Sequence, residues 1–152
     1  MGLLDLASGN SFWRGFDYYR DKKVLDLRQT EKYIFSALVS GSEKTPYRVE
    51  IDLEHPRKSR CNCPHADGKR IICKHMVAVY LMAFPEEAER IYQEALAEEK
   101  EEEQRQEREA DKLTDYVYRM KKEELREALL ELLFDGPEWQ YDRFLREHWI
   151  DG

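Results

Sequence analysis

The feature that most constrains this chain is a set of four metal-ligand side chains within 15 positions. They are Cys61, Cys63, Cys73 and His75, and they include every cysteine of the 152-residue sequence. Three thiolates and one imidazole form a complete tetrahedral ligand set for Zn²⁺, which leaves no coordination position for water or a substrate. A closed site of this kind stabilises a fold. The sequence therefore predicts one structural zinc ion and no catalytic metal.

The spacing within each ligand pair predicts the local backbone. In extended backbone, residues i and i+2 project from the same face, so the sulfurs of Cys61 and Cys63 can reach one ion from a strand end. On a helix, residues i and i+2 do not face each other. The apolar run after the second pair predicts a helix. We therefore expect Cys73 to precede that helix and His75 to lie in its first turn.

Other readings of these residues fit less well. A disulfide framework would leave one of three thiols unpaired, and no secretory signal precedes them. Thiolates with an imidazole favour zinc over harder cations. His65 lies between the ligand pairs and could substitute for a ligand, although we expect a solvated loop residue there. His55 precedes Pro56 and indicates a turn, while His148 belongs to a predicted C-terminal helix.

The pattern C-x-C, a nine-residue gap and C-x-H resembles the SWIM-type zinc finger. The flanks are similar as well, because 14–19 followed by Val24 resembles the upstream segment of small prokaryotic SWIM proteins, and 73–79 resembles the segment after their last ligand pair. The resemblance covers about residues 11–84. It implies a zinc-binding module that acts with nucleic acid, since SWIM fingers are attached to helicases, transposases and recombination mediators.

Charge divides the chain into parts of different character. Residues 1–84 carry a formal charge of +4, and residues 85–152 carry −11. We expect a SWIM-type zinc-binding module over 1–84, a charged helical spacer over 85–111 and a C-terminal helical segment over 112–152. No apolar run is long enough to cross a membrane. Thiols reserved for metal suit a reducing compartment, so we expect a soluble cytoplasmic protein.

The predicted fold class is α+β: a small antiparallel sheet with flanking helices and a structural zinc site, followed by an extended acidic helix and C-terminal helices. Aromatic residues at helical spacing predict a first helix over 11–21. The apolar run 74–84 predicts a buried helix that packs across the sheet. Three strands with short connections are expected at 23–29, 32–39 and 47–53.

The second half of the sequence predicts helices of two kinds. From Pro85 the chain is dense in helix-forming residues, but 97–112 has no apolar seam, so we expect a solvated helix there. Apolar stripes then return, which predicts two or three amphipathic helices with a break near Lys121. Gly136 and Pro137 fit the end of one helix and the first turn of the last.

Six basic residues surround the expected zinc loop and could meet a phosphate backbone. They are Arg57, Lys58, Arg60, Lys69, Arg70 and Lys74. Binding of this kind depends on salt, because each neutralised phosphate releases counterions. Since the helix after the ligands is apolar rather than basic, we expect weak, sequence-insensitive contact with DNA or RNA, or a place beside a helicase, recombinase or other nucleic-acid-processing protein. The alternative is that these charges only solvate a loop.

A second function class is a protein–protein interaction adaptor, in which the zinc module is a scaffold and the helical tail binds the partner. The acidic half would repel DNA, and it could also mask the basic loop. We expect no enzyme activity and no small-molecule substrate. The carboxylates follow a helical Ala/Glu pattern, and the sequence has no phosphate-binding loop, nucleophile elbow or open metal site.

Overall fold

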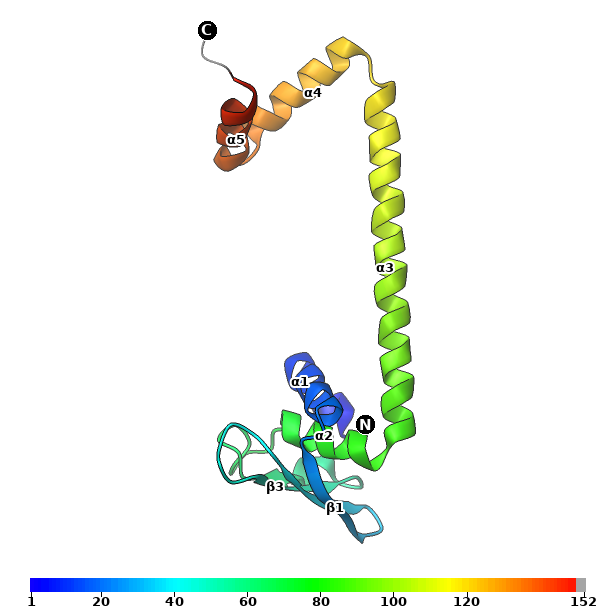
Figure 1. The fold of residues 1–152 in the computed structure, drawn as a ribbon, viewed down its shortest axis with the longest axis vertical. Helices are drawn as coiled ribbons and strands as arrows, with labels where there is room; N and C mark the ends of the chain where they lie inside the picture. The colour runs from blue at the N-terminus through cyan, green and yellow to red at the C-terminus, as the bar shows by residue number, and fades with distance from the viewer. Residues whose placement is uncertain (150–152) are drawn as a thin grey trace. The chain divides into compact units, whose positions relative to one another are not determined.

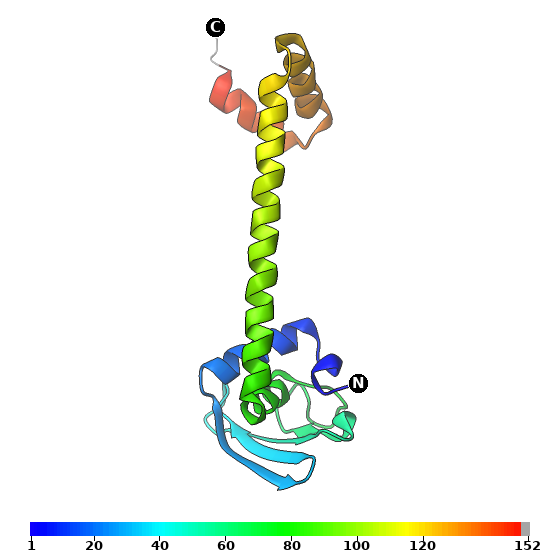
Figure 2. The same cartoon turned by 90° about the vertical axis from the view of Figure 1, so that its right-hand side faces the viewer.

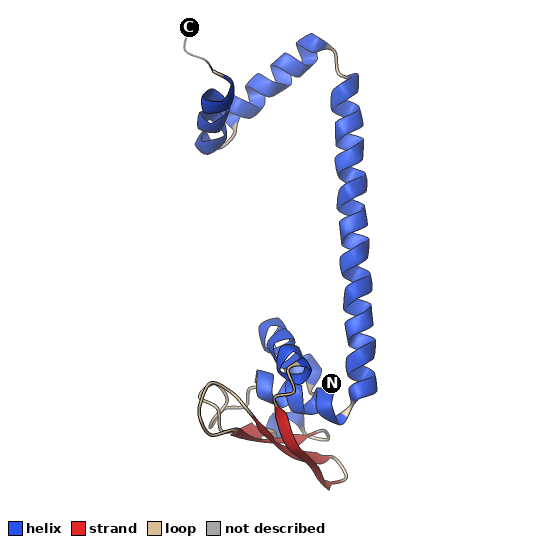
Figure 3. Ribbon diagram, in the orientation of Figure 1, coloured by secondary structure: helices blue, strands red, loops and turns tan. Residues whose placement is uncertain are grey.

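A computed structural model describes residues 1–149 of the chain. The chain forms two compact units, Met1–Leu96 and Ala97–Gly152, and helix α3 (Pro85–Arg119) passes through the boundary between them. The fold class is α+β, as the sequence predicted, with a four-stranded antiparallel sheet and helices (Figures 1 and 3). The end of the predicted C-terminal segment, residues 150–152, lies outside the described residues. No helix within residues 1–149 is both long and apolar enough to cross a membrane.

The first unit contains the sheet, two complete helices, the first turns of α3 and two single turns of 3₁₀ helix. In chain order these elements are η1 (Leu4–Leu6), α1 (Gly9–Arg20), β1 (Val24–Glu31), β2 (Ile34–Val39), β3 (Tyr47–Asp52), η2 (Pro56–Lys58), β4 (Arg60–Cys61) and α2 (Lys74–Ala83). The strands follow one another across the sheet in the order β1-β2-β3-β4. The sequence predicted three of them. The fourth strand has only two residues, which is too short for an alternating pattern to predict it.

Helix α2 lies between the sheet and α1, so that the first unit has three layers (Figures 1 and 2). This position explains why α2 is apolar on nearly every side: Met76 and Leu81 are fully buried, as are Val77 and Val79. The inner face of the sheet supplies alternating residues of β3, including Val49 and Ile51. An all-round apolar helix is what a middle layer requires, because both of its sides face protein.

Helices α1 and α2 approach each other most closely at Gly15. A Cβ atom built on Gly15 would lie 2.5 Å from Cβ of Val77 and 2.7 Å from the backbone oxygen of Lys74. Neither atom is the free end of a flexible side chain, so a larger residue would push the helices apart. Ala78 of α2 is also small and fully buried, but the position where only glycine fits is Gly15 of α1.

Replacing Gly15 with alanine should therefore destabilise the first unit. Overpacking at such a contact costs about 1–3 kcal/mol, which exceeds the gain that alanine brings to a helix. Gly9→Ala is the matched control, because Gly9 begins the same helix and a Cβ there meets nothing within 4 Å. Urea unfolding followed by circular dichroism should show a clear loss for Gly15→Ala and no loss for Gly9→Ala. Equal stability of the two variants would contradict the close approach.

The second unit is helical. After α3 ends, α4 (Lys122–Asp135) begins, and the backbone N–H of Lys121 donates a 3.0 Å hydrogen bond to the Glu124 carboxylate at this predicted break. Helix α5 (Glu138–His148) packs on α4, with the rings of Phe134 and Tyr141 6.2 Å apart. Pro137 precedes α5 as its N-cap and does not occupy its first turn, which corrects the predicted start by one residue.

Candidate metal centre

The structure brings the four predicted ligands together. The Sγ atoms of Cys61, Cys63 and Cys73 and a ring nitrogen of His75 all lie within 4.8 Å of one another, and all four residues are buried. The three cysteines are free thiols. Residues separated by up to 14 positions thus converge on one point inside the first unit.

Two sulfur–nitrogen distances at this point are close to those of a tetrahedral zinc site. The Nδ1 atom of His75 lies 3.7 Å from Sγ of Cys61 and 3.9 Å from Sγ of Cys73. In a tetrahedral site with ordinary Zn–S and Zn–N bonds, an S···N edge is about 3.5 Å and an S···S edge about 3.8 Å. The observed separations are close to these edges. They also identify Nδ1 as the nitrogen that faces the metal position.

Backbone pairing positions the first cysteine. Cys61 ends strand β4 and is paired with Val49 of β3. On one side, the buried Ser59 hydroxyl accepts a 3.0 Å hydrogen bond from the backbone N–H of Asp52. On the other, the Asn62 side-chain oxygen accepts a 2.8 Å hydrogen bond from the backbone N–H of Arg48. These side chains extend a two-residue strand and hold its cysteine at the sheet edge.

A tight turn then returns the chain toward the second ligand pair. The carbonyl of Cys63 accepts hydrogen bonds from the backbone N–H groups of Ala66 and Asp67, at 3.1 and 2.9 Å. Gly68 has a φ of 69°, a left-handed conformation that glycine adopts without steric cost. Cys73 is the N-cap of α2 in extended backbone, and His75 lies in the first turn, as the i,i+2 spacing predicted.

Two tyrosine rings hold the His75 imidazole. Tyr47 of β3 lies 4.6 Å from the imidazole, and Tyr18 of α1 packs on it edge-to-face at 5.2 Å, both measured between ring centroids. The Nε2 atom of His75 is buried and has no hydrogen-bond partner among the described residues. Metal-bound histidines usually donate this second N–H to a carboxylate or carbonyl. Here aromatic packing fixes the ring instead, a role for Tyr18 and Tyr47 that the sequence reasoning missed.

The thiols differ in acidity because of their mutual contacts. A hydrogen bond from Cys61, together with His75 and the backbone N–H of Met76, lowers the pKa of Cys73 to about 4, although burial opposes the shift. The same hydrogen bond and burial raise the pKa of Cys61, and burial raises the pKa of Cys63. A cysteine that binds a metal does so as the thiolate, so a bound metal would remove the protons that remain on these sulfurs.

Comparison with known proteins agrees with this geometry. Residues 47–84 match the family model of the SWIM zinc finger. This segment is a SWIM zinc finger. The finger begins with β3, contains all four ligands and ends just after α2, so α1, β1 and β2 lie outside the matched residues. No curated protein and no solved structure matched the chain.

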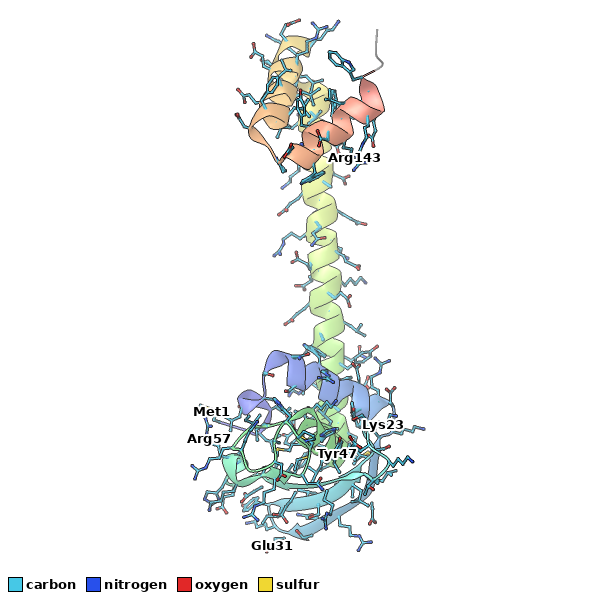
Figure 4. All side chains as sticks on the ribbon, turned by 90° about the vertical axis from the view of Figure 1, so that its left-hand side faces the viewer. Met1, Lys23, Glu31, Tyr47, Arg57 and Arg143 are labelled. Carbon is cyan, nitrogen blue, oxygen red and sulfur yellow. The ribbon has the colours of Figure 1, made fainter. Side chains whose placement is uncertain are left out.

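The basic residues predicted around the SWIM finger have different positions. Five of the six line one open concavity of about 1520 Å³: Arg57, Lys58, Arg60, Lys69 and Arg70. Figure 4 shows Arg57 at this edge of the first unit, beside Met1, which also lines the concavity. Lys74 does not line it. Its ammonium nitrogen lies 4.6 Å from the centroid of the Tyr18 ring, a cation–π contact next to the SWIM finger's ligands.

Metal content distinguishes the ligand histidine from the loop histidine. His65 is exposed and does not belong to the four-residue cluster, whereas His75 is buried within it. We expect His75→Gln to lose zinc and to unfold at a lower temperature, because a structural metal contributes folding free energy. His65→Gln should keep one zinc per chain and wild-type stability. Elemental analysis of dialysed protein with thermal unfolding tests both; zinc loss from His65→Gln would contradict the ligand set.

Proposed function

We propose that the protein is a non-catalytic accessory factor in which one structural Zn²⁺ holds the SWIM finger, and that the finger's basic concavity associates with nucleic acid. Burial of all four ligand residues supports a closed, structural metal. The observation that carries the proposal is that five predicted basic residues, dispersed over 57–70, share one surface. The cytoplasm remains the predicted location, since three free thiols suit a reducing compartment.

The form of the concavity supports binding without sequence readout. The five basic side chains are exposed and come from the 3₁₀ turn η2, the start of β4 and the loop after it. None of them belongs to a helix long enough to enter a groove. The helix that follows the ligands, α2, is buried between the sheet and α1. Contacts to phosphates position a protein on nucleic acid but carry little sequence information. Affinity should therefore depend on salt more than on base sequence.

Neutralising the loop should weaken binding. We expect the variant Arg57→Gln/Lys58→Gln/Lys69→Gln/Arg70→Gln to lose affinity for labelled DNA and RNA in fluorescence-anisotropy titrations of the full chain. The slope of log K against log salt should fall by about 0.9 for each lost phosphate contact on a duplex. The control has the same change of charge at exposed residues outside the concavity: Arg14→Gln/Lys44→Gln/Lys100→Gln/Lys112→Gln.

Comparison of the two variants distinguishes binding by the local basic surface from binding that depends only on the net charge of the protein. The control should bind more tightly than the loop variant at every salt concentration. Absence of wild-type binding to any DNA or RNA at low salt would defeat the nucleic-acid proposal. Equal binding by the two variants would assign the interaction to overall charge and not to the concavity.

A second candidate function, the protein–protein adaptor, is favoured by exposed apolar side chains in the second unit. Tyr118 is 86% exposed, Phe134 68% and Trp139 64%, and several leucines of α4 are also exposed, including Leu130 and Leu132. Large apolar side chains exposed together in one unit mark interaction sites in many proteins. It offers a partner aromatic and aliphatic contacts rather than charge.

Charged residues introduced at these exposed positions should block partner binding without unfolding the second unit. We expect Leu132→Glu/Phe134→Glu to keep the helical circular dichroism of the wild type, because both side chains are exposed. The adaptor function predicts that proteins captured by immobilised wild-type chain are lost with this variant, whereas Glu123→Gln, also on an exposed position of α4, retains them. Identical capture by wild type and double variant would contradict it.

A further inference from the structure

We infer that the outer face of the sheet, through Arg28 and Arg48, is the second half of the basic concavity, and that the whole surface fits the sugar–phosphate backbone of a double helix. This inference rests on the proposed function. It adds residues that the sequence analysis did not single out and commits to one form of nucleic acid. Three features of the first unit carry it: an uncovered sheet face, a positioned arginine and an absence of aromatic side chains.

The two faces of the sheet have opposite character. Residues of the inner face are buried under α2, including Ala37, Val49 and Ile51. Helices α1 and α2 lie on that same side (Figures 1 and 2). On the outer face, Arg28 and Arg48 are exposed, and both line the concavity together with the loop residues. A face that no element of the first unit covers is thus continuous with the basic loop.

Strand register places the arginines across the whole width of the sheet. Arg28 of β1 is paired with Ser36 of β2, which is paired with Glu50 of β3, which is paired with Arg60 of β4. Arg48 lies two residues from Glu50 on the same face. Seven basic residues line the concavity, against the three acidic residues Asp26, Glu50 and Asp67. The lining therefore has a net positive charge, complementary to phosphates.

A bulge in β1 positions Arg28. The ladder between β1 and β2 shifts register between Leu25 and Arg28, and Asp26 in this gap has a φ of 53°. A left-handed conformation is uncommon outside glycine, although Asp tolerates it better than most residues. The Asp26 carboxylate accepts hydrogen bonds from Nε and Nη2 of Arg28, at 3.2 and 3.0 Å. Bulges re-aim side chains, and this one holds a guanidinium at the outer face.

The composition of the lining favours a duplex over a single strand. Proteins that bind single strands combine a basic groove with aromatic side chains on which bases stack. Among the described residues that line this concavity there is no Phe, Tyr or Trp, and the one aromatic ring is the imidazole of His55. A double helix needs no stacking partner, and it presents about one charge per 1.7 Å along its axis. Backbone phosphates of a duplex are the ligand that such a surface can use.

The test compares a short labelled DNA duplex with one of its own strands, each titrated with the full chain by fluorescence anisotropy. We expect wild type to bind the duplex more tightly than the strand. For Arg28→Gln/Arg48→Gln, duplex affinity should fall by about fivefold to tenfold and the salt slope by about two. Arg14→Gln/Lys44→Gln, two exposed cations outside the lining, is the control and should lose little. The charge-conserving variant Arg28→Lys/Arg48→Lys should retain most of the wild-type duplex affinity.

Each outcome decides a separate point. Duplex binding by Arg28→Gln/Arg48→Gln equal to that of the control would overturn the role of the sheet face, while the loop could still bind as proposed. Strand affinity equal to or above duplex affinity would overturn the assignment to a double helix and leave nucleic-acid association intact. Failure of wild type to bind either probe would defeat the proposed function itself. Zinc content and unfolding measured on each variant show that the fold is retained.

Discussion

The convergence of a strand end and a helix start on one metal position is the constraint on which the first unit depends. Cys61 and Cys63 approach from β4 and the turn after it, whereas Cys73 and His75 approach from the start of α2. A core of this size gains much from such a staple, because the sheet is small and its last strand has two residues. Without a metal, buried thiols and a buried imidazole nitrogen would have few compensating contacts.

The SWIM finger also depends on residues outside the matched segment. Helix α1 covers the outer side of α2, and it can do so closely because Gly15 has no side chain to separate the two helices. The same helix carries Tyr18, which packs on His75. Thus the ligand ring is held by Tyr18 from α1, which lies outside the matched residues, and by Tyr47 from β3, which lies within them.

The two faces of the sheet differ in character. Its inner face is apolar and buried under α2, and its outer face presents arginines beside the basic loop. A single alternation of side chains along β3 generates both properties, since neighbouring residues point to opposite faces. The helices of the second unit follow another principle, because many of their large apolar side chains are exposed and their charges lie along solvated helix faces.

The sequence by itself determined the ligand set, the strand and helix backbones on which the ligands lie, the meander of three strands and the break before α4. These follow from local spacing and periodicity, which act over a few residues. Only the tertiary structure decided that β4 completes the sheet and that α2 packs closely on α1 at Gly15. It also decided that Arg28 and Arg48 line the same concavity as the basic loop, whereas Lys74 contacts Tyr18. Those relations depend on the pairing of distant segments, and no local pattern encodes which faces meet.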